Sequence, residues 1–265
     1  MNTKPSELYG DYSPHKSEKL IEQFATSLEQ RSKPVPVFFR ADDIGVSSQN
    51  FSRLLKLFEH YEVPLCLAVV PGWLTDTRMK TLRAICDPES ELWCFHQHGW
   101  LHRNHEQQGK KCEFGSSRHT DDITHDLLNG KRRLESILGN TVFQPFFTPP
   151  WNRCSDETID QLAALGFKGI SRDQAKRKNP SLLPDFAINI DLHTRREQSA
   201  DLGFAALGQE LMRGLEQNML GFMIHHQRMN DHAFDLLARV LYQCQCNRLI
   251  NPAHFTTLYK RSSAP

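Results

Sequence analysis

The chain has 265 residues, of which 39% are hydrophobic and 24% are charged, and its formal net charge is +1. Because this charge is close to zero, we expect neither nucleic acid nor an anionic membrane surface as the main partner. The sequence has no apolar run long enough to span a membrane and no apolar secretion signal near Met1, so a cytoplasmic location is expected.

The first 33 residues are mostly polar and hold one helix-like piece. Large apolar residues recur there at three- and four-residue spacing, which predicts an amphipathic helix over about residues 17–30. We interpret residues 1–33 as an extension with a peripheral helix, followed by a single domain over residues 34–265.

From residue 35 onward, short apolar segments alternate with amphipathic segments. Strands are expected at 35–40, 65–70, 92–95, 143–147, 169–171, 186–192 and 220–226, and helices at 48–60, 76–86, 121–138, 156–165, 204–218 and 232–243. A strand followed by a helix, repeated about seven times, predicts an α/β fold with parallel strands. The glycine-rich nucleotide motifs that accompany many open sheets are missing, which favours a barrel.

Polar and aromatic residues gather where the expected strands end, which is where the active site of a barrel lies. The strand-end residues are Asp42 and Asp43, Trp73, His96 and His98, Thr148 to Asn152, Asp191 and His193, and His225 and His226.

The first of these groups is the pair Asp42 and Asp43. Two neighbouring carboxylates after a buried strand are unfavourable unless a cation, a metal or hydrogen-bond donors balance their charge. The alternative is a turn in which the carboxylates cap the following helix.

Four of the thirteen histidines lie within residues 95–105. Two imidazoles and one carboxylate form a three-ligand zinc site that leaves room for water and substrate. A hydrogen-bonding surface loop is the alternative, which we favour for His105 and leave open for His96.

Together, these motifs resemble those of the polysaccharide deacetylase family, the NodB-homology domain of carbohydrate esterases. The resemblance rests on Asp42-Asp43 after a strand, on the segment from His98 to His102, on Pro149-Pro150-Trp151, and on a histidine that ends a late strand. The ordered motifs extend over about residues 35–226.

The resemblance implies a distorted (β/α)7 TIM-like barrel and a role for each motif residue. The implied metal ligands are Asp43, His98 and His102, the implied general base is Asp42, and the implied general acid is His226, with His225 as the fallback. The implied metal is Zn²⁺, with other divalent metals possible, and its bound water would be the nucleophile.

The chain departs from the family pattern at two places. The third motif usually reads Arg-x-Pro-aromatic, and its arginine orients the catalytic aspartate, but Thr148 stands at this position. Either the role of this arginine is unfilled or another residue takes it, with Arg40 and Arg118 as candidates. The late Leu-x-His motif also matches residues 224–226 only loosely.

Candidates for substrate binding surround the expected site. Aromatic faces suit the apolar face of a sugar or an acetyl methyl group, and core packing is the alternative interpretation of each. The candidates are Trp73, Trp100, Thr148, Pro150, Trp151, Arg118 and Asp191. The charged loop over residues 109–118 has the character of a lid, and a solvated run of charges is the alternative interpretation.

We therefore expect a metal-dependent hydrolase that removes an N-acetyl group from an amino sugar in a glycan, a glycolipid or a nucleotide-linked precursor. One alternative is an amide or deformylating hydrolase acting on a non-polymeric substrate. A second is an inactive carbohydrate-binding protein that retains the metal. The sequence gives no indication of the oligomeric state.

Overall fold

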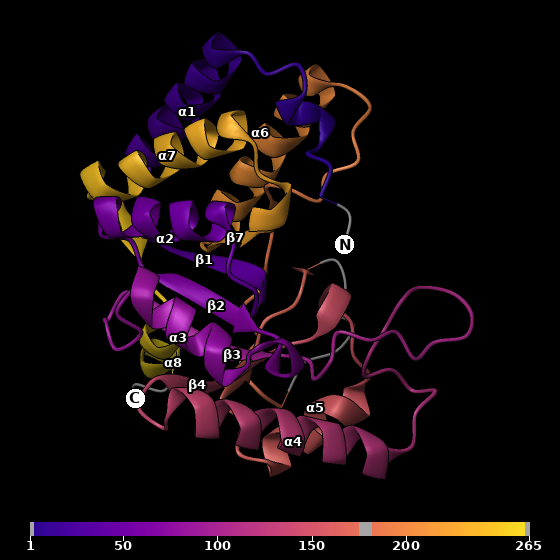
Figure 1. Cartoon of the computed structure of the whole chain (residues 1–265). Helices are drawn as coiled ribbons and strands as arrows, with labels where there is room; N and C mark the ends of the chain where they lie inside the picture. Colours follow the sequence, from indigo (N-terminus) through magenta and orange to yellow (C-terminus); the bar gives the residue numbers. More distant parts are fainter. Residues whose placement is uncertain (1–2, 175–181, 263–265) are drawn as a thin grey trace. The chain divides into compact units, whose positions relative to one another are not determined.

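The computed structural model describes residues 3–174 and 182–262 (Figure 1). The chain divides into two compact units. The first unit comprises Met1–Ala41, Ser48–Leu65 and Ile188–Ala253, and the second comprises Asp42–Ser47, Cys66–Ala187 and His254–Pro265. Each unit therefore joins segments that are far apart in the sequence.

The first unit contains a parallel sheet built around its longest strand. The strands are β1 (Val35–Ile44), β6 (Ile190–Asp191), β7 (Leu220–Ile224) and β8 (Ile250–Pro252). Strand β1 pairs with β7 and with β8, and β6 pairs with β7. Both β1 and β7 are buried along almost their whole length, as expected for near-continuous apolar strands of a covered parallel sheet.

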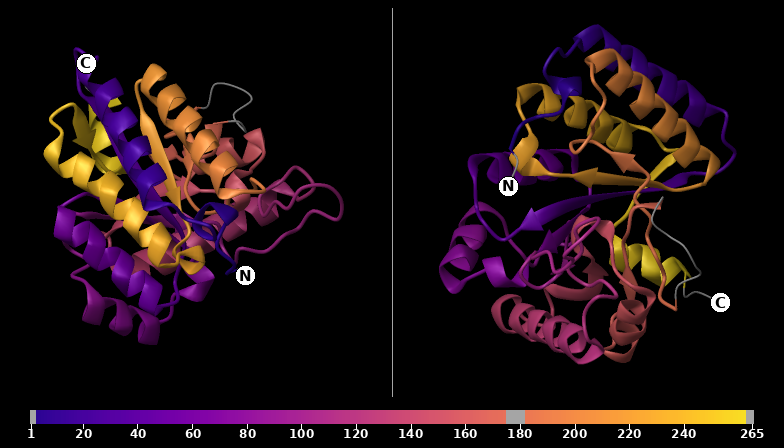
Figure 2. Two further views of the ribbon diagram at one scale, coloured as in Figure 1. Left: turned by 90° about the horizontal axis from the view of Figure 1, so that it is seen from above. Right: turned by 90° about the vertical axis from the view of Figure 1, so that its right-hand side faces the viewer.

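The first unit also contains four long helices. They are α1 (Pro14–Glu29), α2 (Gln49–Tyr61), α6 (Ala200–Glu216) and α7 (Asp231–Cys246). Of these, α6 and α7 contact its strands. Each begins after a serine or asparagine whose side chain accepts a backbone N–H of the first turn, as Ser48 does from Phe51 at 3.1 Å. Helix α1 packs on α6 and α7, as Figure 2 shows.

The second unit continues from the last three residues of β1. Its strands are β2 (Leu65–Val69), β3 (Trp93–His98), β4 (Phe143–Thr148) and β5 (Gly169–Ile170), and its helices are α3 (Asp76–Ile85), α4 (Thr120–Leu138), α5 (Asp156–Ala164) and α8 (Phe255–Ser262). The strands lie in the order β1, β2, β3, β4, β5. The pairing of β3 with β4 shifts register between Phe95 and Gln97, and it places His98 opposite Thr148.

A hydrophobic cluster fills the second unit between β4, β5, α4 and α5. Its buried members are Phe114, Ile123, Leu127, Phe147, Ile159, Leu162, Phe167 and Ile170. Phe114 comes from the long loop between β3 and α4 and is 0% exposed. This loop therefore contributes to the core.

The alternation of parallel strands with helices confirms the expected α/β fold, a distorted (β/α)7 barrel. The strand expected over residues 186–192 is reduced to Ile190–Asp191. It ends there because the Asp191 carboxylate accepts the N–H groups of His193 and Thr194 and so forms a turn. Strand β8 and helix α8 were not expected from the sequence.

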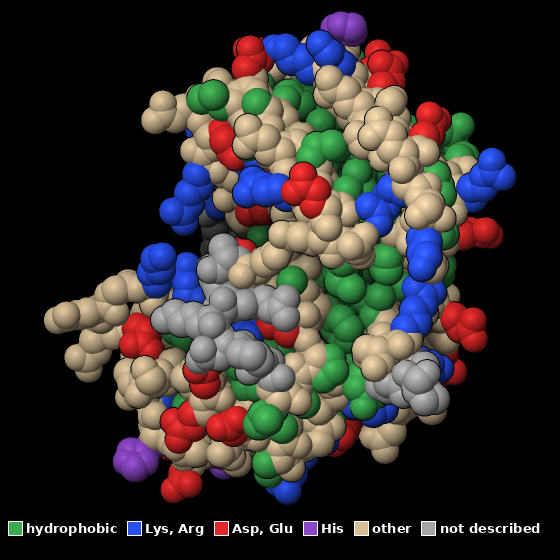
Figure 3. All heavy atoms as spheres, turned by 180° about the vertical axis from the view of Figure 1, so that it is seen from behind, with side chains coloured by type: hydrophobic (Ala, Val, Ile, Leu, Met, Phe, Trp, Pro, Cys, Tyr) green, Lys and Arg blue, Asp and Glu red, His purple; other side chains and the backbone are tan. Residues whose placement is uncertain are grey.

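In the described ranges, no helix is both long and apolar enough to cross a membrane. The face drawn in Figure 3 carries acidic and basic side chains interspersed with one another, in keeping with the net charge of +1.

Candidate metal centre

Three side chains of the second unit converge at the ends of two strands. Asp43 lies near the end of β1, His98 ends β3, and His102 lies four residues further along the chain. The Nε2 atoms of His98 and His102 lie 3.4 Å and 3.1 Å from Oδ1 of Asp43. Each residue offers one ligand atom, and these three atoms lie within 4.8 Å of one another.

The imidazole of His98 is oriented by the backbone of β4. Its Nδ1 lies 2.9 Å from the carbonyl oxygen of Thr148, which can only accept a hydrogen bond. In neutral His98 the proton is therefore on Nδ1, and the lone pair of Nε2 is directed toward Asp43 and His102. A backbone carbonyl that fixes the tautomer in this way is a common partner of a metal-binding histidine.

Thr148 also contacts a second histidine through its side chain. His96 Nε2 lies 2.8 Å from Oγ1 of Thr148, and His96 Nδ1 lies 3.2 Å from the carbonyl oxygen of Cys94. Since Nδ1 donates to that carbonyl, Nε2 of neutral His96 accepts from the threonine hydroxyl. His96 and Thr148 are both 0% exposed, so this bond lies inside the fold.

His102 lies between two tryptophans. The centroid of its ring is 4.5 Å from that of Trp151 and 5.6 Å from that of Trp73. The side chains of His102 and Asp43 are 16% and 12% exposed, whereas that of His98 is 2% exposed. The cluster is therefore accessible to solvent from the side of Asp43 and His102.

Unusual backbone conformations concentrate around the same cluster. Six non-glycine residues in the described ranges have a positive φ, and four of them belong to this part of the chain: Asp43, His102, Trp151 and Asn152. A positive φ is unfavourable for side chains other than glycine, and such strain often marks functional sites.

The loop from His98 to His102 is held by two buried side chains that the sequence did not single out. The Nε2 group of Gln97 donates to the carbonyl oxygens of Gly99 and Leu127 at 3.0 Å and 3.2 Å. The carboxylate of Glu113 accepts backbone N–H groups of the loop. No motif or periodicity in the sequence identifies these two residues.

The protonation of the cluster follows from its charges. Burial lowers the pKa of His98, but the hydrogen bond with Asp43 and the charges of Asp42 and Asp43 outweigh burial, so this pKa is raised. Burial and the charge of His98 lower the pKa of His102 to about 4. In the metal-free protein, His102 is thus neutral near pH 7 and can offer a lone pair.

This donor set fits a divalent metal. One carboxylate oxygen and two imidazole nitrogens are the ligands that Zn²⁺ and related ions accept, and three protein ligands leave further positions for water and substrate. Asp43, His98 and His102 could hold such an ion.

The other candidates of the second unit lie in different surroundings. Pro150 is buried, and Trp100 packs against the hydrophobic cluster around Phe114. Arg118 donates to Asp126 at 2.7 Å and to the carbonyl oxygen of Glu113 at 3.2 Å, so it ties the long loop to α4. Asp42 is 3% exposed and follows the buried residue Ala41 in β1.

The remaining candidates belong to the first unit. The backbone N–H of His225 donates to Nδ1 of His193 at 3.2 Å, and His193 follows the Asp191 turn. His226 is 1% exposed, and its ring lies 5.2 Å from that of Phe51. His225 is partly exposed.

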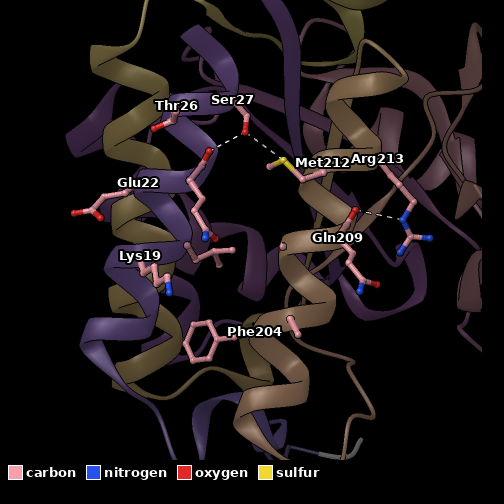
Figure 4. A pocket seen from close by; sticks show the side chains of 12 residues that line it. Lys19, Glu22, Thr26, Ser27, Phe204, Gln209, Met212 and Arg213 are labelled. Atoms are coloured by element: carbon pink, nitrogen blue, oxygen red, sulfur yellow. Dashed lines mark hydrogen bonds between the residues drawn. The ribbon is translucent and has the colours of Figure 1, made fainter. Parts of the chain in front are cut away.

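The first unit also contains a groove between α1 and α6, with a volume of about 1080 Å³. Figure 4 shows Phe204 and Met212 of α6 opposite Lys19 and Ser27 of α1. None of the residues expected in the active site lines this groove.

Comparison with solved structures finds the same fold in several proteins. A candidate polysaccharide deacetylase from Mycobacterium smegmatis matches with a TM-score of 0.62 and 14% identity, over 88% of this chain and 91% of that one. A family 4 acetyl xylan esterase from Clostridium thermocellum, solved with a cobalt ion, matches with a TM-score of 0.55 and 15% identity, over 87% of this chain and 93% of that one. A carbohydrate esterase of the same family from Streptococcus mutans matches with a TM-score of 0.51 and 15% identity, over 84% of this chain and 86% of that one.

Sequence comparison identifies the family. No curated protein sequence matches the chain. The family model described as polysaccharide deacetylase matches residues 27–170, which is more than half of the chain and includes Asp43, His98 and His102. The chain therefore belongs to the polysaccharide deacetylase family.

Proposed function

We propose that the chain is a metal-dependent hydrolase that removes an N-acetyl group from an amino sugar. The observation that carries this proposal is the convergence of Asp43, His98 and His102 in a chain of the polysaccharide deacetylase family. We propose zinc as the metal, with cobalt as a useful substitute because a cobalt ion is bound in the Clostridium thermocellum esterase.

A divalent metal bound by these ligands supplies Lewis acidity and lowers the pKa of a coordinated water. Asp42 is the proposed general base, which accepts the proton of the attacking water. It adjoins Asp43 in the sequence, and its negative charge contributes to raising the pKa of His98. The rings of Trp73 and Trp151 flank His102 and offer apolar surface to an acetyl methyl group or a sugar face.

The proposed general acid belongs to the pair His225 and His226, and it protonates the leaving nitrogen. Sequence resemblance favours His226, with His225 as the fallback. The exposure of the two side chains supports the fallback, because His226 is 1% exposed whereas His225 is partly exposed. Replacing each with asparagine distinguishes them, because loss of the acid lowers turnover about 10²- to 10⁴-fold.

The proposed substrate is an N-acetylated sugar in a glycan, a glycolipid or a nucleotide-linked precursor. Family membership supports an acetylated carbohydrate. Because one structural neighbour is an acetyl xylan esterase, O-acetylated xylan belongs in the substrate panel. The cytoplasmic location remains a prediction.

The test joins metal analysis to acetate release. Protein loaded with zinc or cobalt is incubated with N-acetylated amino sugars, their oligomers and O-acetylated xylan, and free acetate is measured. We expect about one metal per chain and release of acetate, and we expect Asp42→Asn to keep the metal while losing turnover. Loaded wild-type protein that releases no acetate from any N-acetylated sugar would contradict the proposal.

A second candidate function is metal-dependent carbohydrate binding without turnover. It is favoured by Thr148, which stands where the family usually has an arginine. The hydroxyl of Thr148 is hydrogen-bonded to His96 and does not replace that arginine. This alternative predicts sugar binding by loaded protein without any acetate release. Release of formate from N-formylated substrates would instead support the deformylating alternative.

A further inference from the structure

The carboxylate of Glu113 lies inside the loop that carries His102. It accepts the backbone N–H groups of Leu101 at 2.8 Å, Trp100 at 3.2 Å and Arg103 at 3.3 Å. Glu113 is 1% exposed, and these donors flank His102 on both sides in the sequence. A single side chain thus satisfies three backbone donors of the segment that holds one proposed ligand.

The space around this carboxylate is fitted to the loop. Gly99 has a φ of +63°, and a Cβ atom at this position would lie 2.1 Å from Oε2 of Glu113 and 2.5 Å from Cγ of Pro150. Only glycine fits there, because any side chain would displace the carboxylate or the proline. The same loop is also tied to Gly72, whose N–H donates to the carbonyl oxygen of Trp100 at 3.0 Å.

Glu113 is itself anchored to the core through the next residue. The ring of Phe114 is fully buried in the hydrophobic cluster. Its carbonyl oxygen accepts the N–H of Ser155 at 2.9 Å and the hydroxyl of Thr158 at 3.0 Å. The sequence left the loop over residues 109–118 open between a lid and a solvated charge run, and the structure shows that at Glu113 and Phe114 it is buried.

We propose that Glu113 is a positioning residue. By joining the loop that carries His102 to the hydrophobic core, it fixes the position of His102 and so sets the geometry of the metal site. This inference rests on the metal site of the proposed function. Glu113 does not coordinate the metal in this proposal. It acts by keeping Trp100, Leu101 and Arg103 in the one arrangement that places His102 Nε2 beside Asp43.

The chemistry of the side chain predicts which substitutions matter. Two carboxylate oxygens can accept three N–H groups, whereas a glutamine has one oxygen and an NH₂ group that faces the same donors. Glu113→Gln should therefore free at least one buried N–H and let the loop adopt other conformations. Glu113→Asp keeps both oxygens but withdraws them by one methylene, so its effect should be intermediate.

The test measures metal affinity rather than turnover. Metal-free wild-type protein, Glu113→Gln and Glu113→Asp are titrated with Co²⁺ and Zn²⁺ in competition with a chromophoric chelator. The matched control is Glu106→Gln in the same loop, because the Glu106 carboxylate accepts from the Ser117 hydroxyl at 2.9 Å. Circular dichroism of each metal-free variant reports whether it is folded.

We expect Glu113→Gln to raise the dissociation constant of the metal about 10- to 100-fold, Glu113→Asp to raise it less, and Glu106→Gln to leave it unchanged within about threefold. The absorption spectrum of bound Co²⁺ should also change in Glu113→Gln, which a merely structural role would not cause. Wild-type affinity in Glu113→Gln, or an equal loss in Glu106→Gln, overturns the proposal. If Glu113→Gln is unfolded, the metal dissociation constant of Glu113→Asp decides between the two outcomes. If neither variant folds, Glu113 has a structural role only and the proposal is overturned.

These outcomes are distinct from failure of the proposed function. Wild-type protein that binds metal but releases no acetate contradicts the deacetylase proposal and leaves the role of Glu113 intact. Variants that bind metal as wild type does contradict the role of Glu113 and leave the deacetylase proposal intact.

Discussion

Replacing Thr148 with valine removes one hydroxyl and keeps nearly the same shape. The hydroxyl is bonded to His96 Nε2 at 2.8 Å, and both residues are fully buried. Loss of a buried hydrogen bond that leaves the partner without its donor costs about 1–3 kcal/mol. We therefore expect the free energy of unfolding of metal-free protein to fall by about this amount in Thr148→Val.

The same substitution should leave metal binding almost unchanged. His98 is oriented by the carbonyl oxygen of Thr148, and valine provides the same carbonyl. Urea unfolding followed by circular dichroism gives the stability, and chelator competition gives the metal affinity. We expect a lower urea midpoint with a metal dissociation constant within about threefold of wild type.

A double-mutant cycle makes this prediction stricter. His96→Phe removes the other partner and keeps a ring beside Phe255, whose centroid lies 4.9 Å from that of His96. Because replacing both partners by apolar groups of similar shape can be nearly neutral, the double variant should be more stable than the sum of the single effects implies. Strict additivity, or a more than tenfold loss of metal affinity in Thr148→Val, would refute the reasoning.

Three further predictions concern other residues. Saturating Zn²⁺ at 100 times its dissociation constant should stabilise wild-type protein by about 2.7 kcal/mol, a gain that Asp43→Ala should abolish in thermal unfolding. Gly99→Ala should weaken both folding and metal binding, because the new Cβ would collide with Glu113; unchanged urea and metal titrations would contradict this. Burial, with the charge of His225, holds the pKa of His193 well below its usual range, so unfolding takes up a proton as pH falls below about 6.5. Stability should therefore be greatest above pH 6.5 and fall toward pH 5, and His193→Asn should reduce that slope by up to about 1.4 kcal/mol per pH unit in urea titrations at several pH values.

The ligand cluster was predictable because it follows from local rules. Asp43 and His98 stand at the ends of apolar segments, and parallel strands bring their carboxyl ends to one edge of a sheet. His102 follows His98 by four residues, so the chain cannot carry it far away. Strand order and spacing placed these residues among several strand-end candidates, and the resemblance to the polysaccharide deacetylase family singled out the three that the structure brings together.

The support of the cluster was not predictable in the same way. Glu113 lies eleven residues beyond His102 in a loop without periodicity, and only the burial of Phe114 in the core brings its carboxylate to the amides of the loop. Gln97 lies between His96 and His98 in β3. Nothing in the sequence shows that its side chain donates a hydrogen bond to the carbonyl oxygen of Gly99. Such contacts depend on tertiary packing, which hydrophobic patterns do not specify.

Thr148 illustrates how the missing arginine can be understood physically. At this strand end the threonine makes two hydrogen bonds: its hydroxyl donates to His96 Nε2, and its carbonyl oxygen accepts from His98 Nδ1. An arginine would bring a charge to a position that is 0% exposed, and a buried charge requires a charged partner to offset its lost hydration. The hydroxyl of Thr148 is instead satisfied by the buried ring of His96 at 2.8 Å. The carbonyl of Thr148 keeps its orienting function toward the metal ligand His98 whichever side chain stands at this position.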